Sequence, residues 1–134
     1  MSALAKRRAV VVGVALLLAA SHVVGVARYL PADLAVYYAS YFSDVSVPFG
    51  FYFLLFAAEP RWPPLSAWVV KAAVIIGLAS AAETAQHFGV PALGSTFDPL
   101  DYLMYFAGGL LAVLVDRLVF SRVFAFWTEG RPGA

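Results

Sequence analysis

Cysteine is absent from this chain of 134 residues, so no disulfide and no thiolate ligand or nucleophile can form. Charged residues are also scarce: they make up 13% of the sequence, against roughly 25% in an average soluble domain. Hydrophobic residues make up 63%. A chain with so little polar surface cannot cover itself in water, which predicts that a lipid bilayer covers it.

Sequence motifs of the common catalytic and binding sites are missing as well. There is no glycine-rich phosphate loop, no HExxH motif and no serine in a nucleophile motif. The only basic run, Lys6-Arg7-Arg8, is short and directly precedes an apolar stretch, so nucleic-acid binding is not expected. An enzyme would have to use carboxylates alone as general acid and base. An enzyme of this kind is the third and least favoured of the functional hypotheses, and we expect no cofactor and no metal ion.

Four segments of the chain have the apolar character of membrane crossings. A bilayer core of about 30 Å takes about 20 helical residues to cross. We predict crossings at about 9–28, 43–59, 64–88 and 99–120. These crossings predict an all-α, four-transmembrane-helix bundle that forms a single membrane domain, residues 1–134.

The first segment has one alternative interpretation, a cleaved signal peptide. Its basic start fits, and Ala19-Ala20-Ser21 offers small residues for cleavage. The apolar run continues to Ala27, however, which is longer than the apolar region of a signal peptide. We therefore predict a crossing.

The second segment is less regular than the others. Residues 31–42 are rich in tyrosine and precede Ser43-Asp44-Val45-Ser46, so we predict a short interfacial segment before the crossing. One longer crossing with a kink at Pro48 is the alternative. We expect the phenylalanines of this crossing to face lipid or a partner, and residues 121–127 to lie along the membrane surface. These phenylalanines are Phe49, Phe51, Phe53 and Phe56.

The charged residues predict the orientation. With the N-terminus in the cytoplasm, eight of the nine basic residues fall on or near the cytoplasmic side, and only Arg28 falls outside. Four crossings then place both termini in the cytoplasm. The eight are Lys6, Arg7, Arg8, Arg61, Lys71, Arg117, Arg122 and Arg131.

The polar residues that could take part in binding or catalysis gather in the outer layer of this arrangement. The second and fourth crossings begin with aspartates there, and polar residues at i, i+3 and i+4 share one face near the outer end of the third. We predict an outward-facing polar pocket that two further residues support. The pocket candidates are Asp44, Glu83, Gln86, His87, Asp98 and Asp101, and the supporting residues are His22 and Tyr105.

Glu83 is the most informative member of this set. It lies about five residues, or ~7 Å, inside the helix end, which is too deep for capping and at the wrong terminus for the helix dipole. A carboxyl group there pairs with a donor, is protonated or serves a function. The candidate donors are Gln86, His87, His22, Arg28 and Tyr105.

Structural roles compete with a functional role for the other members. Asp98 followed by Pro99 is a good helix start, and Asp44 could cap the second crossing in the same way. His22 has the alternative of a hydrogen-bonded interior histidine. Glu83 and His87 at i, i+4 give only two metal ligands, which is a weak signal.

Residues 83–109 resemble the VanZ-like membrane proteins. Glu83 and Gln86 match the E-x-x-Q of that family's third helix, a short loop with Gly94 to Asp98 follows, and Asp101 and Gly108 match an acidic residue and a glycine seven residues later. Asp44 matches an aspartate at the start of the second helix. The resemblance implies a multi-pass protein of the bacterial inner membrane with an envelope-related role.

The chain departs from the family pattern at four positions. Val45 and Pro48 stand where the family has a lysine and a histidine, Gly94 or its neighbour replaces an arginine, and Tyr105 replaces an asparagine. These departures remove the cations that could pair with the carboxylates.

Two functional hypotheses follow. The first is an outward-facing acidic pocket that binds a lipid-linked, glycopeptide or cationic ligand. The second is a small accessory subunit of a larger membrane complex, in which the polar residues only hold the helices together. The expected partners are the lipid bilayer and either such a complex or further copies of this chain.

Overall fold

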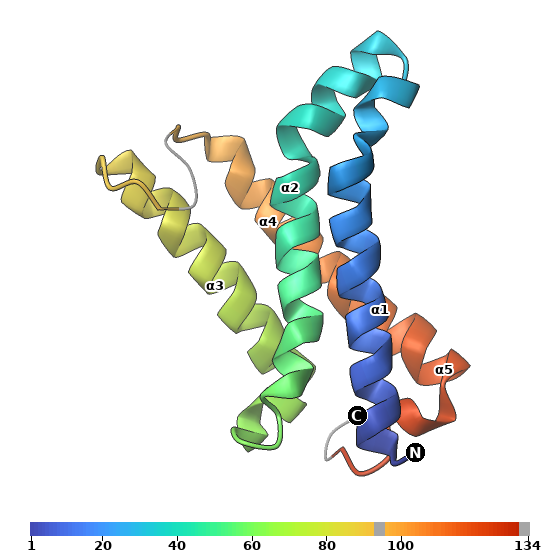
Figure 1. Ribbon diagram of the computed structural model, residues 1–134. Helices are drawn as coiled ribbons and strands as arrows, with labels where there is room; N and C mark the ends of the chain where they lie inside the picture. Colours follow the sequence, from blue (N-terminus) through green and yellow to red (C-terminus); the bar gives the residue numbers. More distant parts are fainter. Residues whose placement is uncertain (93–95, 132–134) are drawn as a thin grey trace.

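The computed structural model describes residues 1–92 and 96–131. Every regular element in these residues is a helix, which confirms the all-α class. Three helical stretches are long and apolar enough to cross a membrane: Ala3–Val24, Trp68–His87 and Pro99–Val123. In Figure 1, α2 (Ala32–Leu54) lies between α1 (Ala3–Val24) and α3 (Trp68–His87), and α4 (Pro99–Leu114) crosses behind it.

α1 begins and ends at residues that suit these positions. The Ser2 hydroxyl accepts the backbone N–H of Ala5 at 3.3 Å and caps the helix. Gly25 ends it in the left-handed conformation, with φ 66°, which glycine adopts without steric cost. α1 therefore stops before residue 28, the predicted end, and a short turn of 3₁₀ helix, Val26–Tyr29, leads into α2.

α2 is one continuous helix of 23 residues, which corrects the predicted break near residue 43. The helix runs through the serine-rich stretch and contains Pro48. Serine does not have to end a helix, because its hydroxyl can bond to a carbonyl one turn earlier. Ser40 does this within α2, donating to the carbonyl of Val36 at 2.9 Å. α2 is not one of the three stretches that length and composition mark as membrane spans.

The remaining elements connect and extend the four main helices. Two 3₁₀ turns, Leu55–Ala57 and Pro63–Ser66, join α2 to α3. After α4 the chain continues as a π-helix, Val115–Phe120, then α5 (Ser121–Val123) and a 3₁₀ turn, Ala125–Trp127.

α2 and α4 form the most extensive helix pair, and Gly108 lies at their closest approach. A Cβ atom added to Gly108 would lie 2.2 Å from the carbonyl oxygen of Val45. Ala112, one turn later on the same face, is fully buried. Small residues let two helix backbones pack this closely. Gly108 and Ala112 therefore allow α2 and α4 to pack closely.

The molecule has two unlike ends. The loop end contains residues 25–31, 88–92 and 96–98, and the terminal end contains the start of α1, residues 55–67 and residues 124–131 (Figure 1). The core of buried aromatic side chains lies toward the terminal end. It consists of Tyr52, Phe53, Phe56 and Trp127, with Val11, Ile75, Ala112 and Val113 beside them.

This core corrects one expectation. Phe53 and Phe56 are buried rather than lipid-facing, whereas Phe51 is exposed as predicted. Residues 124–127 pack against the helices, because Trp127 is fully buried against Phe53 and Phe56. The last described residues therefore fold back onto the terminal end.

Elsewhere, large apolar side chains cover the outside of the helices. Leu17 is 72% exposed and Leu78 is 65% exposed, although both lie in the middle of their helices. Water would disfavour such a surface, and hydrocarbon would not. This exposure agrees with a multi-pass membrane protein.

Candidate functional site

Charged side chains gather in two clusters, one at each end of the molecule. The acid cluster at the loop end consists of Asp44, Glu83, Asp98 and Asp101. The charge network at the terminal end consists of Glu59, Lys71, Asp116 and Arg131, with Tyr52 and Trp127 bonded to it.

Glu83 is the buried centre of the acid cluster, with only 1% of its surface exposed. Its Oε1 accepts the backbone N–H of Asp98 at 2.7 Å, and its Oε2 accepts the hydroxyl of Tyr105 at 3.1 Å. One of the predicted donors, Tyr105, is therefore a partner. The second partner is a backbone N–H, which side-chain chemistry in the sequence could not indicate.

The bond from Asp98 completes the start of α4. Asp98 is the N-cap, and its Oδ1 accepts the N–H of Leu100 at 2.9 Å. In a capping box, a carboxylate three residues after the cap accepts the N–H of the cap residue. Asp101 stands at that position in the sequence, but Glu83 of α3 makes the bond instead. The capping role predicted for Asp98 is confirmed.

Asp44, Asp98 and Asp101 are partly buried. Asp101 interacts electrostatically with the other three carboxyl groups, and Asp44 interacts with Glu83 and Asp98. In residues 1–92 and 96–131 no ion pair involves any of these four; the three ion pairs found there all join residues of the charge network. The acid cluster is thus a set of like charges without a cation.

Gln86 and His87 lie at the edge of the acid cluster rather than within it. The side-chain amide of Gln86 donates to the carbonyl of Ala92 at 2.7 Å and so holds the chain after α3. The His87 ring packs against Phe97, with 4.7 Å between the ring centres, and is exposed. The part of the family resemblance at Gly94 lies outside the described residues.

His22 does not join the acid cluster. Its Nδ1 lies 2.8 Å from the carbonyl oxygen of Leu18, and its Nε2 lies 3.4 Å from the hydroxyl of Ser43. The ring also contacts Phe42, at 4.9 Å between ring centres. His22 therefore links α1 to α2. The described residues contain no group of three or more potential ligands in the arrangement of a metal site.

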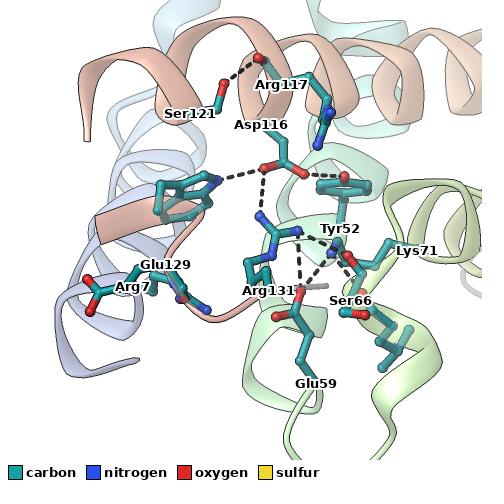
Figure 2. Close-up of polar contacts among 12 residues, drawn as sticks. Arg7, Tyr52, Glu59, Ser66, Lys71, Asp116, Arg117, Ser121, Glu129 and Arg131 are labelled. Atoms are coloured by element: carbon teal, nitrogen blue, oxygen red, sulfur yellow. Dashed lines mark hydrogen bonds and ion pairs between the residues drawn. The ribbon is translucent and has the colours of Figure 1, made fainter. Parts of the chain in front are cut away.

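Asp116 is the buried centre of the charge network, with 1% of its surface exposed (Figure 2). The hydroxyl of Tyr52 donates to its Oδ2 at 2.6 Å, and the indole N–H of Trp127 donates to its Oδ1 at 2.6 Å. Arg131 Nη1 lies 3.5 Å from the same Oδ1. The carboxylate thus connects α2 to the last described residues.

Glu59 and Lys71 form the second pair of the network. Lys71 is fully buried, and its Nζ donates to Glu59 Oε1 at 2.7 Å and to the carbonyl of Leu65 at 2.8 Å. Arg131 Nη2 lies 3.6 Å from Glu59 Oε1. The face of Phe56 packs between the two cations, 4.1 Å from Lys71 Nζ and 4.7 Å from Arg131 Cζ.

Arg7 attaches the start of α1 to the same end. Its Nε donates to the carbonyl of Phe126 at 3.1 Å, and its Nη2 donates to the carbonyl of Glu129. The neighbouring Arg8 is exposed. One member of the basic run is therefore a buried structural residue.

No pattern in the sequence indicates the charge network. Lys71 and Arg131 have the positions of ordinary flanking charges on the cytoplasmic side, a role that most Lys and Arg residues near membrane helices have. Asp116 offered one usable signal, because it lies within a largely apolar stretch, where a charge needs a partner. No spacing in the sequence connects it to Trp127 or Arg131.

No family model, curated protein or solved structure matches this chain.

Proposed function

We propose that this chain is a four-crossing membrane protein whose outer end binds a cationic group through Asp44, Asp98 and Asp101. The loop end then faces the outside of the bacterial inner membrane, and the terminal end faces the cytoplasm. The resemblance to the VanZ-like proteins supports an envelope-related role.

α2 is the fourth crossing in this proposal. Its 23 residues span about 35 Å as a helix, which is enough for a bilayer core of about 30 Å. It also packs against α1, α3 and α4. A helix surrounded on several sides by other crossings can carry more polar residues than one that faces lipid, which accounts for the buried Ser46 and Tyr52.

The distribution of charge supports the orientation. In this arrangement the half of the molecule toward the terminal end carries eight basic and three acidic residues, and the half toward the loop end carries one basic and five acidic residues. Basic residues near crossings favour the cytoplasmic side. Both termini would therefore be cytoplasmic.

The observation that carries the binding proposal is the contrast between the two clusters. At the terminal end, two carboxylates are matched by two cations within the network. At the loop end, four carboxyl groups gather without a cation in the described part of the chain. Repulsion between like charges disfavours such a cluster unless a cation or a proton neutralises part of it.

The carboxyl groups have different parts in this proposal. Glu83 is buried and both its oxygens are bonded within the chain, so it positions the start of α4. Asp44, Asp98 and Asp101 are only partly buried and can contact a ligand. The ligand would carry an ammonium or guanidinium group, on a lipid-linked molecule, a glycopeptide or a small molecule.

The test measures binding of spermidine, a simple polyamine, to the protein in lipid nanodiscs. Asp101→Asn should weaken binding about tenfold, which corresponds to the loss of one charge-assisted contact. Asp33→Asn is the matched control, because Asp33 is an exposed acid at the same end but outside the cluster. Equal affinities for the wild type and both variants would contradict the proposal.

One observation favours a second candidate, the accessory subunit. Both oxygens of Glu83 are used by bonds inside the chain, as expected if the polar layer only holds the helices together. In that case the function belongs to partner proteins. Native mass spectrometry after mild solubilisation distinguishes the two: a complex of fixed composition supports the subunit, and a monomer or homo-oligomer supports the binding protein.

A further inference from the structure

We propose that the terminal end contains a guanidinium-binding site that Arg131 occupies as a tethered ligand. Arg131 would swing out at Gly130 to admit a guanidinium or alkylammonium compound from the cytoplasmic side. The site is separate from the acid cluster, so it does not depend on the function proposed for the loop end.

The surroundings of Arg131 are those of a guanidinium site. Its guanidinium group lies 3.5 Å from Asp116 and 3.6 Å from Glu59, and it donates to the carbonyl of Ser66 at 3.3 Å. The ring of Phe56 lies against its face, 4.7 Å from Cζ. Carboxylates at the edge, a carbonyl and an aromatic face are the groups that recognise guanidinium. Figure 2 shows Arg131 between the two carboxylates.

The charge network favours a cation at this position. Without Arg131, its remaining charged members are Glu59, Lys71 and Asp116, with a net charge of −1. Arg7 also interacts electrostatically with Glu59, but its guanidinium group bonds the carbonyls of Phe126 and Glu129 instead. Lys71 stays paired with Glu59 at 2.7 Å, so Asp116 is the carboxylate left without a cation. A buried, unpaired carboxylate is costly, and a cation from solution can replace Arg131 there.

Arg131 is held less tightly than the rest of the network. Its ion pairs of 3.5 and 3.6 Å are longer than the 2.7 Å pair of Lys71, and its Nε has no hydrogen-bond partner among the described residues. Tyr52 and Trp127 already bond Asp116 at 2.6 Å without it. The loss of Arg131 therefore leaves the other bonds of the network in place.

The chain also gives Arg131 room to move. Gly130 precedes it in the left-handed conformation, with φ 71°, and nothing lies within 4 Å of a Cβ built on it. A cavity of about 270 Å³ adjoins Arg131 and opens to the surface. Its lining residues are Glu59, Pro60, Pro63, Ser66, Gly130 and Arg131. Trp127, fully buried, keeps the rest of the segment attached while the arginine moves.

The test is chemical rescue of Arg131→Ala by methylguanidinium at millimolar concentration. We expect the variant to unfold at a lower temperature than the wild type, and methylguanidinium to raise its Tm by about 5 °C when the site is saturated. Tetramethylammonium, which has no N–H donors, should not do so. Arg122→Ala is the control, because Arg122 lies in α5, nine residues before Arg131, and is exposed.

Each outcome decides the proposal. A rise in Tm confined to Arg131→Ala supports the site, and no rise, or an equal rise in Arg122→Ala, overturns it. If Arg131→Ala cannot be purified alone, recovery of folded protein only in methylguanidinium supports the site. Failure to recover it with or without methylguanidinium, while Arg122→Ala folds, overturns it.

Discussion

Glu83 on α3 accepts the backbone N–H of Asp98 at 2.7 Å, so a carboxylate from one helix completes the N-terminal cap of the next. The two residues are 15 positions apart, and the residues between them include the loop that joins α3 to α4. This bond explains why a charged residue lies inside an apolar helix. It also sets the position of Asp98 and Asp101 relative to Asp44.

Replacing Glu83 should therefore weaken the α3–α4 junction. Glu83→Ala leaves the Asp98 N–H and the Tyr105 hydroxyl without their acceptor, at a cost of about 2–4 kcal/mol. Glu83→Gln keeps one acceptor oxygen and should cost less, about 1 kcal/mol. Thermal unfolding in detergent, followed by circular dichroism, measures both. Equal stability of the wild type and Glu83→Ala would show that the bond contributes nothing.

Gly108 should not tolerate a side chain. In Gly108→Ala the new methyl group would lie 2.2 Å from the Val45 carbonyl oxygen, so α2 and α4 must separate. We expect a loss of about 1–3 kcal/mol. Gly77→Ala is the matched control, because nothing lies within 4 Å of that position and the helix gains up to about 1 kcal/mol. The same unfolding measurement compares them, and equal effects would contradict the close approach.

Trp127 should stabilise the folded protein through its indole N–H as well as through the size of its ring. Trp127→Phe keeps an aromatic ring in the core but removes the hydrogen bond to Asp116, which should cost about 1.5–3 kcal/mol because the acceptor is charged. Trp62→Phe replaces an exposed indole and should change the stability by less than about 0.5 kcal/mol. A Trp62→Phe variant as unstable as Trp127→Phe would contradict the buried network.

Arg7 and Arg8 offer a comparison between neighbours of equal charge. Arg7→Ala removes two hydrogen bonds to the carbonyls of Phe126 and Glu129, whereas Arg8→Ala removes an exposed side chain. We expect a loss of about 1.5–3 kcal/mol for the first and within about 0.5 kcal/mol for the second. Limited proteolysis gives an independent measure, because a detached terminal segment is cut faster. Cleavage at the same rate in both variants would be evidence against the attachment.

The sequence predicted features that depend on long, regular patterns. Apolar length indicated α1, α3 and α4, and the Asp98-Pro99 pair predicted the start of α4 correctly. The cost of burying Glu83 predicted that it needs a donor, and Tyr105 is one of its two donors. Each of these predictions rests on local geometry or on the energetics of a single residue.

The remaining features depend on contacts between residues with no regular spacing. The serine-rich stretch suggested a break in α2, but serine hydroxyls can bond within a helix, as Ser40 does. The six residues Val115–Phe120 form a π-helix rather than an α-helix, so a 3.6-residue period no longer describes which side chains share a face there. Asp116 lies in this stretch. A periodic sequence pattern could therefore not predict the hydrogen bond between Asp116 and Trp127.

The measurement that tests the central claim most directly is which side of the membrane each connection faces. The chain has no cysteine, so Tyr29→Cys and Arg61→Cys each introduce a single label site in an exposed residue, one on either side of α2. A maleimide that cannot cross membranes is applied to right-side-out and to inverted vesicles. If α2 is the fourth crossing, Tyr29→Cys reacts only in right-side-out vesicles and Arg61→Cys only in inverted ones. Reaction of both variants in the same vesicles would contradict the four-crossing arrangement.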